Sequence, residues 1–199
     1  MELLKQLSHD YLVMFGMVNA VGNLPIFADL THGMDSAARD RTFRVAVGTG
    51  AGIVFLFAVF GNWMLRSVFE VDTASFKIAG GILVFMVAVQ GRFQGSQKAP
   101  ALQEHYQNVA VYPMGFPFLA GPGTIVTTIL LFQAGGSLVT FAAVALVYLS
   151  ILPLMHLAPL LERAVGRVGI QVITRILYIF IAAKAVAFVV DGVRASFAR

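Results

Sequence analysis

The fold is decided by one stretch of sequence, Asn19-Ala20-Val21-Gly22-Asn23-Leu24-Pro25-Ile26-Phe27. It lies inside the first apolar run, residues 11–30, and about 20 helical residues can cross the ~30 Å hydrocarbon core of a bilayer. Pro25 removes a backbone donor and clashes with the carbonyl of Val21. Amides and freed backbone groups in lipid need partners in protein or in a water-filled cavity. We therefore predict a broken helix that lines a polar site; a kink that only packs helices is the alternative.

The composition is that of an integral membrane protein. Of the 199 residues, 58% are hydrophobic and 12% are charged, and the mean hydropathy is +0.82. A soluble domain is about 45–50% apolar and about 25% charged. Only helices and closed barrels span lipid, and continuous, non-alternating apolar runs favour helices. We therefore predict an all-α integral membrane protein.

The apolar runs predict one transmembrane domain over residues 1–199 with six transmembrane helices. The predicted spans cover about 10–30, 43–64, 73–91, 109–132, 138–157 and 171–190. The polar segment 92–108 is the predicted mid-chain loop. Six spans place both termini on one side of the membrane.

A second interruption falls in the fourth span. Three prolines and three glycines occur there at membrane depth: Pro113, Gly115, Pro117, Gly121, Pro122 and Gly123. A regular helix cannot run through Gly121-Pro122-Gly123, so we expect the helix to restart after it, with Thr124 near its N-terminus and Thr127 in the next turn. The alternative is a re-entrant turn without a ligand.

The two interruptions predict an internal repeat. The separation of Gly22 from Gly121 is almost the same as that of Lys77 from Arg175. Each half then reads as a broken helix followed by two helices, with repeat one at about 8–91 and repeat two at about 109–192. Because three spans is an odd number, the two repeats must be inverted. Paired interruptions in inverted repeats point to a transporter site near the midplane.

Such a site suits a small zwitterion. Helix N-termini favour a carboxylate, and amide oxygens or open carbonyls favour an ammonium group. The predicted substrate-binding residues are Asn19, Gly22, Asn23, Pro25, Ala120, Gly121, Pro122, Gly123, Thr124 and Thr127. Three intramembrane cations, Lys77, Arg175 and Lys184, are candidates for coupling or gating; snorkelling to the interface is the alternative for Lys77 and Lys184.

Other functional classes lack their signatures. The acidic residues near the spans fall at span ends, so neither a divalent-metal site nor a midplane carboxylate relay is predicted. The sequence has no His-Glu-x-x-His, Gly-x-Ser-x-Gly or Walker-type motif and no Cys, so we expect no enzyme, cofactor or metal. The net charge of +4 is spread over loops, which indicates lipid headgroups and not nucleic acid as partners. A homo-oligomer is compatible with this interpretation.

The distribution of basic residues predicts that both termini lie outside the cytoplasm. The side of the termini carries Lys5, Arg66, Arg194 and Arg199, and the other side carries Arg39, Arg41, Arg44, Arg92, Lys98, Arg163 and Arg167. Cytoplasmic loops are the richer in Lys and Arg. The second side is therefore predicted to be cytoplasmic.

Three motifs in order resemble those of the MarC family. These are the stretch from Asn19 to Phe27, Phe76-Lys77-Ile78-Ala79-Gly80-Gly81, and Pro117-Phe118-Leu119-Ala120-Gly121-Pro122-Gly123-Thr124; Asp191-Gly192 resembles the closing motif. Ala20 stands where the family usually has proline. The resemblance implies a six-helix protein of the bacterial or archaeal inner membrane. It also implies a secondary transporter of small neutral amino acids such as glycine or alanine, working by alternating access, with a non-transporting scaffold or regulator as the alternative.

Overall fold

The computed structural model describes residues 2–31, 33–93 and 109–197, and this part of the chain is helical without strands. Most of the predicted mid-chain loop, 92–108, lies outside the described residues. The elements are α1 (Glu2–Val18), α2 (Ala20–Leu30), α3 (Ser36–Trp63), the π-helical turn η1 (Met64–Val68), α4 (Thr73–Phe93), the irregular segment η2 (Ala110–Leu119), α5 (Pro122–Gly135) and α6 (Ser137–Phe197).

Part of the predicted span pattern is confirmed. Three described helical segments are long and apolar enough to cross a membrane: Ser36–Val68, Leu138–Leu157 and Gln171–Phe197. A fourth is obtained if η2 and α5, which meet at 54°, form one bent span. The apolar part of α4, Thr73–Met86, is shorter, and α1 and α2 have 17 and 11 residues. The all-helical membrane class is therefore confirmed, whereas six spans in two inverted repeats stay a prediction.

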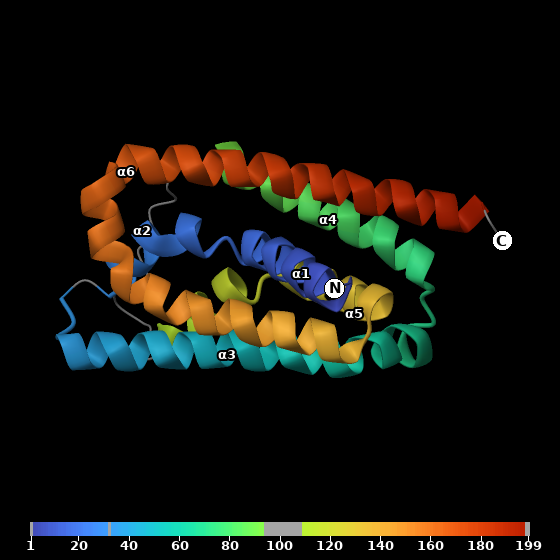
Figure 1. Ribbon diagram of the computed structural model, residues 1–199, viewed down its shortest axis with the longest axis horizontal. Coiled ribbons are helices and arrows are strands. Elements are labelled where there is room, and N and C mark those ends of the chain that lie inside the picture. The colour runs from blue at the N-terminus through green and yellow to red at the C-terminus, as the bar shows by residue number, and fades with distance from the viewer. Residues whose placement is uncertain (1, 32, 94–108, 198–199) are drawn as a thin grey trace.

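Helix α6 reverses direction within its length. Gly166 has a φ of +72°, a backbone conformation that glycine adopts without steric cost. Figure 1 shows the first part of α6 lying beside α3 and the part after the bend returning along α4. The bend therefore joins two layers of helices, with α1, α2 and α5 between them (Figure 1).

The contact between α4 and the second part of α6 is close because glycines line it. A Cβ on Gly81 would lie 2.7 Å from the carbonyl oxygen of Ala185, and one on Gly192 would lie 2.8 Å from that of Ala74. Small residues let transmembrane helices approach to backbone contact. The packing thus gives Gly192, in the closing Asp-Gly pair, a structural role.

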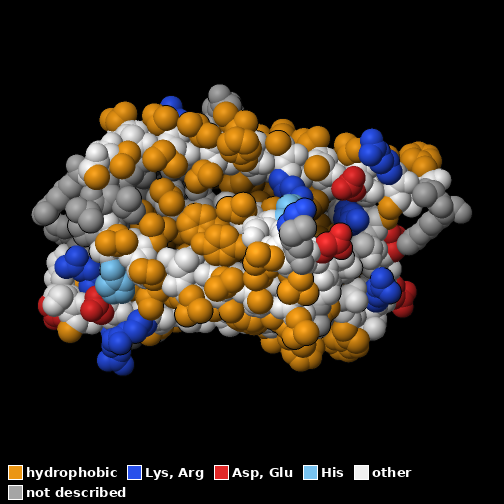
Figure 2. Space-filling view, viewed as in Figure 1, with side chains coloured by type: hydrophobic (Ala, Val, Ile, Leu, Met, Phe, Trp, Pro, Cys, Tyr) orange, Lys and Arg blue, Asp and Glu red, His pale blue; other side chains and the backbone are white. Residues whose placement is uncertain are grey.

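The surface matches a lipid environment. Large hydrophobic side chains are exposed along the length of the molecule, including Leu149 at 69% and Phe180 at 67%. In Figure 2 hydrophobic side chains cover the middle of the molecule, whereas charged side chains gather at the two ends of the long axis and near the start of α1. An apolar band between charged ends is the pattern expected of a bilayer-spanning bundle.

Candidate functional site

The first helix is broken, as predicted, but the break lies at Asn19 and not at Pro25. Asn19 has a φ of +49° and separates α1 from α2, whereas Pro25 lies inside α2. Asparagine enters the left-handed region more readily than most residues because its short polar side chain hydrogen-bonds locally. The site residue Asn19 is therefore itself the point where the helix changes direction.

The second break lies between η2 and α5. Tyr112 and Phe116 have extended backbone within η2, and each precedes a proline, which disfavours the helical conformation of the residue before it. Helix α5 begins at Pro122 with Gly121 as its N-cap. The helix thus restarts two residues earlier than predicted. Proline is tolerated at the first helical position, because the backbone N–H that it lacks would have no intrahelical partner there.

The side chain of Asn23 joins the two breaks. Its Nδ2 lies 3.3 Å from the carbonyl oxygen of Val18, at the end of α1, and 3.3 Å from that of Phe118, at the end of η2. Tyr148 of α6 donates from its hydroxyl to the carbonyl oxygen of Leu119 at 2.8 Å. Carbonyls released by both interruptions are therefore satisfied by side chains from other segments, as burial in lipid requires.

Helices α1 and α5 pack through a face that carries hydroxyl groups. The Thr128 hydroxyl donates to the carbonyl oxygen of Thr124 at 2.8 Å and lies 3.4 Å from the sulfur of Met14. A Cβ on Gly123 would lie 3.0 Å from the terminal methyl of Met17. The structure therefore brings the predicted residues Gly123 and Thr124 next to the helix that ends at Asn19.

Two buried oxygens that belong to predicted site residues have no hydrogen-bond partner among the described residues. They are Oδ1 of Asn19, a residue 6% exposed, and Oγ1 of Thr127, a residue 0% exposed. A side-chain hydrogen bond joins Asn19 to Tyr178 of α6. The Oδ1 atom of the same amide has no hydrogen-bond partner among the described residues. A buried polar atom without a partner costs about 1–3 kcal/mol, which marks both oxygens as candidate ligand contacts.

The remaining predicted residues fall into two groups. Ala120 is fully buried at the second break, while Gly22 and Gly121 are half-buried and Pro122 is exposed. Among the described contacts, none joins the three predicted coupling cations to either break. Arg175 is exposed, Lys77 is half-buried, and Lys184 places its Nζ 5.3 Å from the ring centroid of Phe188 on its own helix. A coupling or gating role for these cations stays a prediction.

A cavity of about 330 Å³ opens beside the paired breaks, at the end of the molecule that carries the start of α3. Its apolar lining is Leu24, Phe27, Ala28, Phe43 and Met155, and its other lining residues are Thr31, Gly33, Ser36, Arg39, Asp40 and His156. The ring of Phe27 stands edge-on to that of Phe118, with 6.1 Å between centroids. Phe27 of the cavity lining therefore contacts a residue at the end of η2, next to the second break.

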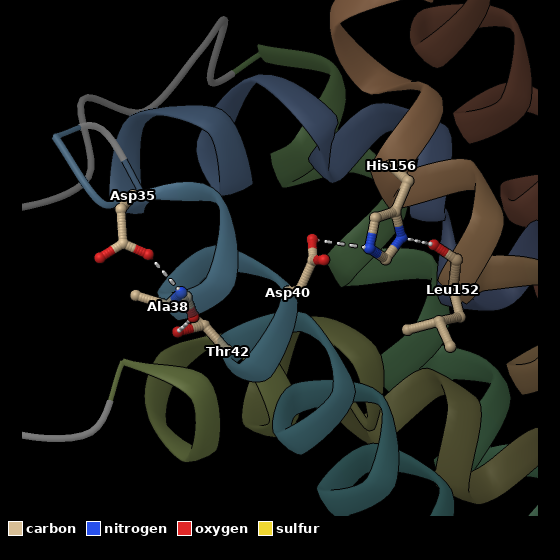
Figure 3. A network of polar contacts seen from close by, with 6 residues as sticks. All are labelled: Asp35, Ala38, Asp40, Thr42, Leu152 and His156. Atoms are coloured by element: carbon tan, nitrogen blue, oxygen red, sulfur yellow. Dashed lines mark hydrogen bonds and ion pairs between the residues drawn. The ribbon is translucent and has the colours of Figure 1, made fainter.

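Sequence reasoning missed the polar residues of this cavity. The Nε2 of His156 lies 3.0 Å from Oδ1 of Asp40, and its Nδ1 donates to the carbonyl oxygen of Leu152 at 2.8 Å (Figure 3). Asp35, which accepts from the backbone N–H of Ala38 at 2.8 Å, caps the N-terminus of α3 and fixes the start of the helix. The pairing of α3 with α6 depends on how the helices pack, and no local sequence pattern indicates it.

Comparison with known proteins shows the family of this chain. A model described as MarC family integral membrane protein matches residues 4–197. The chain belongs to the MarC family. The match includes both helix breaks, the cavity and the contact between α4 and α6, so these features lie within the family's common region.

MarC relatives occur in bacteria and archaea. The chain is 31% identical over 191 residues to a UPF0056 membrane protein of Methanocaldococcus jannaschii, covering 90% of this chain and 92% of that protein. It is 32% identical over 197 residues to the UPF0056 membrane protein YhcE of Escherichia coli, and the match covers 94% of this chain and 91% of YhcE. A UPF0056 membrane protein of Archaeoglobus fulgidus is 35% identical to this chain over 194 residues, and the match covers 92% of this chain and 90% of that protein. No solved structure matches the MarC chain.

Proposed function

We propose that this protein is a secondary transporter, not an enzyme, that carries small neutral amino acids such as glycine and alanine by alternating access. The observation that supports it most is the meeting of the two helix breaks, with the Asn23 amide 3.3 Å from the carbonyl oxygen of Phe118. Interrupted helices that meet inside a membrane protein are the usual construction of a transporter site. The proposed location is the inner membrane, with both termini outside.

The chemistry of the breaks fits a zwitterion. Helix α5 begins at Pro122 without a side-chain cap, so its N-terminal amides and the positive end of its dipole face the break. These groups favour a carboxylate. The unpaired oxygens of Asn19 and Thr127 are acceptors that can receive hydrogen bonds from an ammonium group. The small side chains of Ala120 and Gly123 limit the size of the substrate.

The position of the cavity supports alternating access. The break is closed, because Asn19, Asn23 and Thr124 are all buried. The cavity reaches Leu24 and Phe27 from one end of the molecule. A closed centre with a cavity on one side is what one state of such a carrier requires, and Phe27 is the side chain that would have to move.

A membrane scaffold or regulator is the second candidate function. The observation that favours it is that same closed packing at the break. In this role Asn23 and Tyr148 would only satisfy backbone carbonyls, and the cavity would not connect to the centre. The two candidates differ in whether a substrate crosses the bilayer.

Flux measurements test the proposal. The full chain is reconstituted in liposomes, and uptake of labelled glycine and alanine is followed under imposed proton and sodium gradients. We expect flux above protein-free liposomes, and strong loss of flux in Asn19→Gly, which keeps the positive φ accessible while removing the amide. The control is Asn62→Leu, which breaks the 3.0 Å contact with Gln133. Absence of flux for both amino acids under every gradient would favour the scaffold.

A further inference from the structure

Arg39 of α3 lines the cavity beside the breaks. Among the described residues, the Nε of Arg39 is shielded from solvent and has no hydrogen-bond partner, and neither of the ion pairs found there, His9–Asp10 and His156–Asp40, includes this side chain. A guanidinium stays charged in proteins and matches a carboxylate with two parallel hydrogen bonds. A shielded N–H without an acceptor is costly, so the Nε of Arg39 is suited to donate to an anion in the cavity.

A carboxylate lies at the next position of the same helix. Asp40 lines the cavity together with Arg39, and one of its oxygens is 3.0 Å from Nε2 of His156. The Nδ1 of His156 must be a donor, because it faces the carbonyl oxygen of Leu152. An incoming ammonium group would compete with the His156 ring for the Asp40 carboxylate.

We propose that this cavity is an entry site for the transported amino acid, in which Arg39 binds the carboxylate and Asp40 binds the ammonium group. The inference rests on the proposed transport function and adds a second site to it. The apolar part of the lining, Leu24 and Phe27, takes the small side chain. The cavity volume of about 330 Å³ is at the lower end of the range of small-molecule sites, roughly 300–1,000 Å³.

The location of the cavity gives the entry site a direction. It opens at the end of the molecule that carries Arg41 and Arg44 at the start of α3, which the charge distribution predicts to be cytoplasmic. Its floor, Phe27, contacts Phe118, whose carbonyl accepts from Asn23. The cavity lining is thus linked through Phe27 and Phe118 to the end of η2 at the second break.

Calorimetric titration of the purified full chain tests this site without requiring transport. The probes are alanine, propionate, which has only the carboxylate, and ethylamine, which has only the ammonium group. We expect alanine to bind, Arg39→Gln to weaken alanine and propionate by at least about tenfold, and Asp40→Asn to weaken alanine while sparing propionate. The matched control is Arg41→Gln, an exposed position two residues away on α3, which should leave all three affinities unchanged.

The outcomes separate this inference from the transport proposal. Alanine affinity that is unchanged in Arg39→Gln overturns the entry site, even if the wild type transports alanine. Binding that depends on Arg39 in a protein without flux supports the site and contradicts the transporter. Arg39→Lys, which keeps the charge but loses the bidentate geometry, shows intermediate affinity if the site is correct. Melting curves of each variant identify loss of binding that comes only from unfolding.

Discussion

The Nδ2 of Asn23 lies 3.3 Å from the carbonyl oxygen of Phe118, and this contact links two interruptions that are far apart in the sequence. The same amide reaches the carbonyl oxygen of Val18 at 3.3 Å. One side chain thus satisfies a freed carbonyl from each broken helix. Because Asn23 is only 8% exposed, water has little access to replace it, and the relative position of the breaks depends on it.

Replacing Asn23 by leucine should therefore destabilise the protein. Two buried carbonyls lose their donor, and each unsatisfied group costs about 1–3 kcal/mol. We expect a lower thermal midpoint in detergent, measured by loss of ellipticity or by aggregation, together with loss of flux. Asn62→Leu, which breaks one contact far from the breaks, should lower stability less and retain flux. Equal flux in both variants would contradict the link between the breaks and transport.

Two neighbouring threonines on α5 allow the proposed role of Thr127 in binding substrate to be tested against the structural role of Thr128. Thr127 has a buried hydroxyl that finds no partner in the described part of the chain, whereas the Thr128 hydroxyl donates to the carbonyl oxygen of Thr124. Thr127→Val should keep or raise stability, by up to about 1 kcal/mol, while reducing transport. Thr128→Val should lower stability by about 0.5–1.5 kcal/mol. Melting curves measured beside flux distinguish the two, and a Thr127→Val protein with normal flux would remove that hydroxyl from the site.

Glycine substitutions test the contact between α4 and α6. A Cβ on Gly81 would meet the carbonyl oxygen of Ala185 at 2.7 Å, and a backbone atom cannot move aside easily. We expect Gly81→Ala to cost about 1–3 kcal/mol, the usual range for overpacking. Gly52→Ala is the matched control, since nothing lies within 4 Å of the added methyl. The prediction fails if both variants unfold at the same denaturant concentration.

The membrane orientation can be tested with single cysteines, because the natural sequence has none. Ala37 and Ser67 are exposed near opposite ends of the Ser36–Val68 span. In intact cells a membrane-impermeant maleimide should label Ser67→Cys, whereas Ala37→Cys should react only after permeabilisation. The reverse labelling pattern would place the termini in the cytoplasm and the cavity on the outer side of the membrane.

Some local features could be read from sequence and others could not. The existence of both breaks follows from residues that disfavour a continuous helix, and the structure confirms both. The first break was assigned to Pro25 but lies at Asn19, because a left-handed asparagine turns the chain there while α2 continues through the proline. The cavity was missed, because Asp40 and His156 come together only after α3 and α6 pack.

The sequence by itself determined the membrane class, the helical architecture and the existence of two helix interruptions, because these depend on hydrophobicity and on local backbone preferences. The tertiary structure alone decided which interruptions face each other, which carbonyls Asn23 and Tyr148 satisfy, and which charges line the cavity. The reason is physical: those contacts join segments that lie far apart in the chain and are brought together by helix packing, which leaves no periodic signal in the sequence.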